Sequence, residues 1–120
     1  MTARTVTVQT LDHGPVTVAE PGWCTGHVDQ PVENRTDLCH AGPARTLGYD
    51  DRPLWHAEVV AYPFAEDPAR RGPGLYVEAA PFARTLAPAD IVRLAAALVE
   101  HTARLRRMAR ELAALRDGGQ

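Results

Sequence analysis

Strict alternation of apolar and polar residues marks the first segments of the chain. In residues 5–10, Val6 and Val8 alternate with Thr and Gln, which is the period-two pattern of a half-buried strand. His13-Gly14-Pro15 is typical of a turn, and Val16-Thr17-Val18 predicts a second short strand after it. We therefore expect a β-hairpin at the start of the chain.

Two later segments alternate in the same way. They run from Trp55 to Tyr62 and from Leu75 to Ala80, and a polar loop with Arg and Pro residues joins them. Two alternating segments joined by such a loop pair most simply as antiparallel neighbours. We expect a second hairpin here.

A long helical segment follows. Pro88 suits the first helical position, and Asp90 lies near the positive end of the helix dipole. No residue that breaks helices interrupts the segment before Asp117-Gly118-Gly119. The sequence predicts one helix over residues 87–117, roughly 46 Å long at ~1.5 Å per residue.

Apolar residues in this helix recur in alternating steps of three and four, the a/d pattern of a coiled coil. We expect the alanine-rich first half to pack on the sheet and the arginine-carrying second half to project and pair with a second copy. In a parallel pair, Glu111 at position g would lie beside Arg116 at position e. The alternative is that the whole stripe covers the protein's own sheet. The stripe consists of Ile91, Leu94, Leu98, His101, Leu105, Met108, Leu112 and Leu115.

These elements predict an α+β fold with a small antiparallel sheet of three to four strands, an irregular loop and one long C-terminal helix. A length of 120 residues is typical of a single domain. We expect one domain over residues 1–120, with the sheet and loop in 5–86 and the helix in 87–117.

Residues 21–53 show neither period and are rich in Pro, Gly, Asp and Thr. A structureless loop of this length is improbable unless something holds it in place. The loop contains Cys24, His27, Cys39 and His40 in the arrangement C-x2-H-x11-C-H. Because zinc prefers Cys and His ligands, these four residues are candidate ligands of a zinc ion that orders the loop.

The second pair in this arrangement is less convincing than the first. Adjacent residues in an extended chain point to opposite sides, so Cys39 and His40 both bind one ion only in a tight turn. His13 or His56 could replace one of the four ligands. The other interpretations are a metal-free structural role for the cluster and, less favoured, a disulfide or a reactive thiol.

Net charge and composition limit the classes of function that the protein can have. The net charge is −2, all 13 basic residues are arginine, and no apolar stretch is long enough to span a membrane. The start of the chain lacks the apolar core of a signal peptide, so we expect a cytoplasmic protein. Arginines on the helix allow nucleic-acid binding as an alternative, although Glu100 and Glu111 interrupt them. A small zinc hydrolase is a further alternative, but no H-E-x-x-H or deaminase motif supports it.

The segments PGWCTGH, His40-Ala41-Gly42 and LAPADIVRLAAALVEHTARL resemble an uncharacterised family of small actinobacterial proteins, a domain of unknown function with a Trp-Cys-x-x-His motif and a long C-terminal helix. The resemblance spans about residues 23–105. It implies that Cys24, His27 and His40 are the likeliest ligands, and it implies no activity. We expect a small interaction or regulatory protein with a structural zinc site, a helix-mediated homodimer and no identifiable small-molecule substrate.

Overall fold

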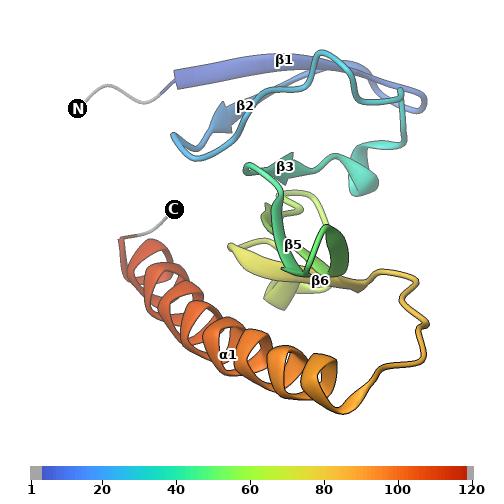
Figure 1. The fold of residues 1–120 in the computed structure, drawn as a ribbon. Helices are drawn as coiled ribbons and strands as arrows, with labels where there is room; N and C mark the ends of the chain where they lie inside the picture. The colour runs from blue at the N-terminus through green and yellow to red at the C-terminus, as the bar shows by residue number, and fades with distance from the viewer. Residues whose placement is uncertain (1–3, 119–120) are drawn as a thin grey trace.

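The computed structural model describes residues 4–118 and confirms the predicted α+β class, with two antiparallel sheets and one long helix (Figure 1). Figure 1 shows the N-terminal hairpin, the larger sheet and the helix as successive layers. The elements are β1 (Arg4–Thr10), β2 (Gly14–Glu20), β3 (His40–Ala41), β4 (Arg45–Tyr49), β5 (Arg52–Ala61), β6 (Gly74–Ala79) and α1 (Pro88–Asp117), with 3-10 turns at Arg35–Asp37 and Pro68–Arg70.

The predicted N-terminal hairpin is present as a separate two-stranded sheet. β1 and β2 pair antiparallel with Val6 opposite Val18 and Val8 opposite Val16. Gly14 begins β2 with a φ of +59°, a conformation that glycine adopts without steric cost. The valines share one half-buried face, so this face of the hairpin turns toward the rest of the protein.

The second sheet has β5 at its centre. β6 pairs with one edge of β5, which confirms the predicted antiparallel pair, while β3 and β4 pair with the other edge. β3 and β4 lie inside the segment that we expected to be irregular, so that expectation was wrong for residues 40–41 and 45–49. Leu47 and Tyr49 alternate inward in β4, but the register shifts at Gly48 and interrupts the period.

The hydrophobic core is small. Leu47 and Ala57 of the sheet cluster with Met108 of α1, and Leu75 packs against them. Leu47 is the largest side chain that is fully buried among the described residues. A core of this size supplies limited stability, so the fold depends on further sources of order. The buried apolar side chains are Cys24, Leu38, Leu47, Tyr49, Ala57, Ala61, Ala65 and Met108.

α1 covers the free edge of the sheet at β4. His101 Nε2 donates a hydrogen bond to the Gly48 carbonyl at 2.6 Å, and Arg104 donates to the Thr46 carbonyl at 3.1 Å. These carbonyls lie two residues apart on the side of β4 that faces away from β5. The helix therefore satisfies backbone groups that an edge strand otherwise leaves without partners.

The structure divides the helical stripe into two columns, each with a period of seven residues. Leu94, His101, Met108 and Leu115 of one column are buried or half-buried, whereas Ile91, Leu98 and Leu105 of the other are exposed and only its last member, Leu112, is half-buried.

The two fully buried residues of α1 are His101, near its middle, and Met108, in its second half. The expectation that the second half projects was wrong, because Met108 belongs to the core cluster and Arg104 contacts β4, while the first half contacts the end of β4 through Tyr49 and Asp90. No helix among the described residues is long and apolar enough to cross a membrane.

Candidate metal centre

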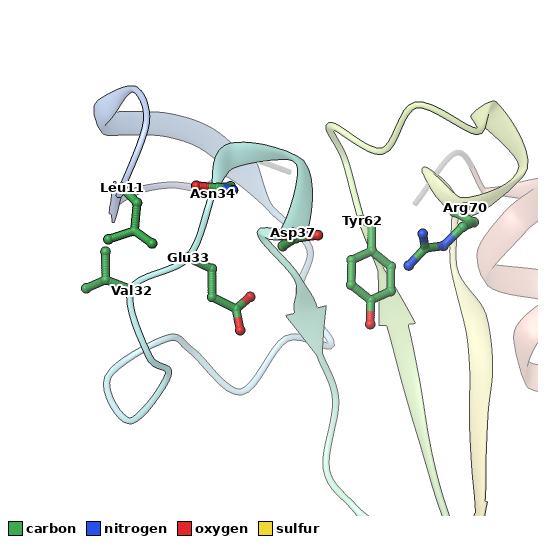
Figure 2. Close-up of a pocket in the computed structure, with 7 residues that line it drawn as sticks. All are labelled: Leu11, Val32, Glu33, Asn34, Asp37, Tyr62 and Arg70. Carbon is green, nitrogen blue, oxygen red and sulfur yellow. The ribbon is translucent and has the colours of Figure 1, made fainter.

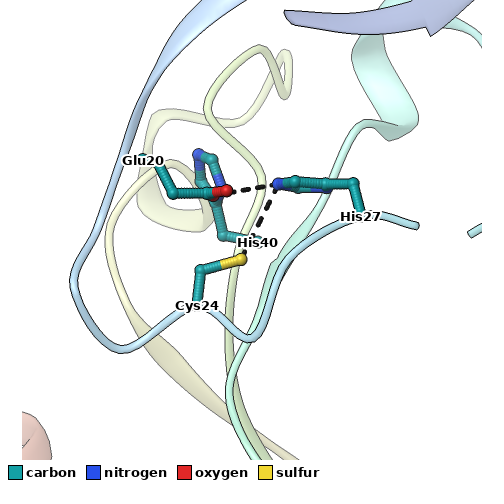
Figure 3. A group of neighbouring side chains, drawn as sticks. All are labelled: Glu20, Cys24, His27 and His40. Atoms are coloured by element: carbon teal, nitrogen blue, oxygen red, sulfur yellow. Dashed lines mark hydrogen bonds and ion pairs between the residues drawn. The ribbon is translucent and has the colours of Figure 1, made fainter. Parts of the chain in front are cut away.

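Four side chains from three parts of the chain converge beside the N-terminal hairpin. They are Glu20 at the end of β2, Cys24 and His27 in the loop that follows, and His40 at the start of β3. Their potential ligand atoms all lie within 4.8 Å of one another. Figure 3 shows Cys24 and the two imidazoles gathered around the Glu20 carboxylate. The group could hold a metal ion.

Local backbone hydrogen bonds bring the loop to this position. The Cys24 N–H donates to the Pro21 carbonyl at 3.1 Å and closes a turn after β2. The Thr25 N–H donates to the carbonyl of Ala41, the neighbour of His40, at 2.9 Å. Gly26 has a φ of +105°, which glycine tolerates best, and its N–H points at the Cys24 sulfur 3.4 Å away. These hydrogen bonds fold the C-x2-H segment without the help of an ion.

The distances between the donor atoms suit a tetrahedral ion. Glu20 Oε1 lies 2.9 Å from His27 Nε2 and 2.8 Å from His40 Nδ1. The Cys24 sulfur lies 3.7 Å from His27 Nε2. Ligand atoms at ~2.0–2.3 Å from a tetrahedral zinc are roughly 3.3–3.6 Å apart, so small shifts would complete the coordination.

Gln30 orients the ring of His27. The Gln30 amide nitrogen donates to the Cys39 carbonyl at 3.3 Å, so the amide oxygen faces His27 Nδ1 at 3.0 Å. With Nδ1 donating to Gln30, Nε2 bonds the Glu20 carboxylate at 2.9 Å only when it also carries a proton, and a metal ion between the two groups would replace that proton. A second partner on the far nitrogen is the usual arrangement of a histidine that binds a metal.

His40 is the member whose contacts a metal would complete. Its Nδ1 is buried and lies 2.8 Å from Glu20 Oε1, yet the geometry does not make a hydrogen bond, and the nitrogen has no other partner. Two ligands of one ion can lie this close without a hydrogen bond between them, because their lone pairs point at the ion. In a hydrogen-bonded pair, by contrast, the N–H points at the acceptor.

Burial controls the charge of the site. The side chains of Glu20, His27 and His40 are only 4, 6 and 3 % exposed. Burial lowers the pKa of His40, although the Glu20 charge opposes it, and this favours the neutral ring that binds metals.

The two acidic groups of the site respond to burial differently. Burial acts to raise the pKa of Glu20, but hydrogen bonds from Cys24 and His27 outweigh it and leave that pKa below its ordinary value. Burial raises the pKa of the Cys24 thiol. A bound cation reverses this effect, because a coordinated thiol loses its proton.

The other predicted ligands lie apart from the group. The Cys39 thiol is half-buried and donates to the His40 carbonyl at 3.3 Å. His13 contacts Asp12 at the hairpin turn, and His56 contacts Thr46 on the larger sheet.

Glu20, in contrast, is a member of the group that the sequence analysis did not propose. The alternation of Val16 and Val18 continues to Glu20 and places it on the inward face of β2, and this signal could have identified it.

Two cavities lie near the loop, and neither reaches Glu20, Cys24 or His40. One, of about 430 Å³, lies between the loop and β5, where Tyr62 and Arg70 face Glu33 and Asp37 (Figure 2). The other, of about 330 Å³, separates β1 from residues 27–32 and touches only the outer side of the site at His27. Both cavities are therefore separate from the centre of the site.

Comparison with known proteins gives one match. Searches of curated proteins and of solved structures found no similar protein. A family described as Domain of unknown function (DUF6907) matches residues 5–114, which include all four members of the site and nearly all of α1. The match confirms the expected resemblance to a domain of unknown function. The chain belongs to the DUF6907 family.

Proposed function

We propose that the protein is a small cytoplasmic interaction or regulatory protein whose N-terminal half is held in shape by a structural zinc ion on Glu20, Cys24, His27 and His40. The buried His40 Nδ1 carries this proposal, because it lies 2.8 Å from the Glu20 carboxylate and has no hydrogen-bond partner. An ion between the two would give both a favourable contact, and it would also use the lone pair of His27.

The donor set favours zinc in a structural role. One thiolate, two imidazoles and one carboxylate are ligands that zinc accepts, and four protein ligands complete its tetrahedron. A catalytic zinc keeps a position open for water and needs a cleft for substrate. The ligands here are buried, and the two nearby cavities do not reach the centre of the group. These features support the structural role over the hydrolase alternative.

The location of the site supports the same role. Glu20 ends β2, Cys24 and His27 belong to the loop, and His40 begins β3, so one ion would tie the separate hairpin to the larger sheet. Because the hydrophobic core is small, an ion at this place would add substantially to the stability of the fold. In small metal domains the free energy of metal binding becomes free energy of folding.

Elemental analysis of the purified protein and of matched cysteine variants tests the proposal. We expect about one zinc per chain in the wild type, a loss of most of it in Cys24→Ser, and an unchanged content in Cys39→Ser, whose thiol lies outside the group. Glu20→Gln should weaken binding and leave the protein folded, since the amide keeps the shape of the side chain. Metal-free wild type, or equal zinc in the Cys24 and Cys39 variants, would refute the proposal.

X-ray absorption at the zinc edge of the wild type covers the case in which Cys24→Ser fails to fold. We expect one sulfur and three nitrogen or oxygen neighbours. Two sulfurs would identify Cys39 as a ligand in place of Glu20 or a histidine. A Glu20→Ala variant that binds zinc as tightly as the wild type would remove Glu20 from the ligand set, which would contradict the closed structural site and favour hydrolysis.

A further inference from the structure

An apolar strip runs along the exposed side of the first half of α1. Ile91, Leu98 and Leu105 are 53, 45 and 41 % exposed, and Val92 and Val99 beside them are 70 and 72 % exposed. At 100° per residue these five side chains lie on one side of the helix, next to the column that faces the sheet. Between residues 91 and 105, Ala95 and Thr102 fill the positions between them. We call this set of residues the outer strip.

The sheet beside α1 is also incompletely covered. Ala57 belongs to the core cluster, and Val77 is its partner on β6 and lies on the same face, yet Val77 is 46 % exposed. Trp55, two residues before Ala57 on this face, is also exposed. The chain has a radius of gyration of 17.6 Å, against about 14 Å for a compact domain of 120 residues. The monomer therefore leaves apolar surface open on both α1 and the sheet.

We propose that the outer strip binds the outer strip of a second copy of this chain, with the two helices antiparallel and Leu98 at the centre. The five exposed side chains offer on the order of 500 Å² per copy, and Trp55 and Val77 extend this toward the ~800 Å² that each partner contributes to a standard interface. A second copy brings an apolar surface of identical length, which suits a two-fold interface.

Charge determines the direction of the pair. Arg106, Arg110 and Arg116 follow the strip, whereas only Asp90 and Arg93 carry charge around its beginning. A parallel pair places the three arginines of one copy beside those of the other, and an antiparallel pair separates them. The parallel pairing of Glu111 with Arg116 loses its basis, because Glu111 already contacts Arg45 at 2.9 Å. The proposal does not depend on the metal site.

Sedimentation equilibrium of the wild type as purified and of Leu98→Glu tests the interface. We expect a dimer for the wild type and at least a tenfold weaker association for Leu98→Glu, with equal zinc content and helical circular dichroism. Arg107→Glu is the matched control, since residue 107 lies on the opposite, exposed side of α1, and it should remain dimeric. A monomeric wild type, including one that binds an unrelated protein through the strip, or a Leu98→Glu variant that dimerises like the wild type, would overturn the proposal.

Cysteine cross-linking in a Cys39→Ser background tests the direction. Val99→Cys, next to the centre, should form a disulfide between copies. Val92→Cys should not, because an antiparallel pair centred on Leu98 places its two copies about 20 Å apart along the axis at ~1.5 Å per residue. Efficient cross-linking of Val92→Cys would show a parallel pair and contradict the proposed orientation.

Discussion

The two halves of this protein are ordered by different means. Around the metal centre, residues 20–40 contain little regular structure, and the order comes from polar groups that meet in a buried site: a carboxylate, a thiol and two imidazoles. Along α1 the order comes from an apolar repeat, of which one column packs on the sheet and the other is exposed from Ile91 to Leu105. An irregular segment needs a specific ligand to hold it, whereas a regular one needs only an apolar surface to cover it. The first half thus contains a candidate metal site, and the second leaves an apolar surface uncovered.

Metal removal should have the largest effect and should destabilise the N-terminal half far more than α1. Structural zinc contributes ~10 kcal/mol or more to the folding of small zinc domains, which is comparable with the whole stability of a typical domain. With a chelator we expect the amides of β2 and the loop to exchange fast with solvent, while those of α1 near Met108 stay slower. Hydrogen exchange measured by NMR or mass spectrometry checks this, and added zinc should restore protection. Equal loss in both regions would show that they unfold as one unit.

Met108→Ala should have the next largest effect and act on the other half. Met108 is 5 % exposed in the core cluster, and truncation of such a side chain costs about 2–5 kcal/mol. Zinc content should be unchanged, because Met108 is not part of the metal centre. Denaturant melts beside elemental analysis check both points, with Arg107→Ala as an exposed control of the same helix. Loss of zinc in Met108→Ala would show that the two halves are coupled.

Asp12→Ala should have the smallest effect and act where the hairpin meets the loop. The Asp12 carboxylate accepts a hydrogen bond from the Arg35 N–H at 2.8 Å, and this bond, with help from His13, lowers the pKa of Asp12 below 3.8. A carboxyl with a lowered pKa in the folded state stabilises the fold above its unfolded pKa, and the stabilisation disappears as the pH falls through the lowered value.

The Asp12→Ala variant should therefore melt slightly below the wild type at pH 7, and the difference should shrink below pH ~4. Thermal melts over this pH range measure the difference. Asp29→Ala, an exposed acid of the same loop, controls for loss of a charge. A difference that stays constant with pH would contradict this assignment.

The regular elements were predictable because their patterns are local. The alternation of Val6 and Val8 and the helical period after Pro88 depend only on neighbouring residues, and the strands and helix that they predict are present. β4 was missed because Gly48 shifts its register. The helical period shows which side of α1 is apolar, but not how far along the helix the sheet lies. That position depends on where residues 80–87 place the start of the helix.

The metal centre was partly predictable for a similar reason. Cys24, His27 and His40 are residue types that stand out as ligands, and the structure places them together. Glu20 belongs to a common residue type at the end of a strand, so only its place on the inward face of β2 distinguishes it. Cys39 was included from its position beside His40, but neighbours in an extended chain point apart, and its thiol lies outside the group.

The contacts of His101 and Arg104 with the carbonyls of β4 have a consequence for synthesis. α1 follows every strand in the chain, so β4 is complete on the ribosome before the helix that covers it exists. Until then its outer edge can pair with the strand of another nascent chain, which is a route to aggregation. A stop codon early in α1 would extend this exposure permanently, and truncated chains should accumulate in inclusion bodies even when their metal ligands are intact.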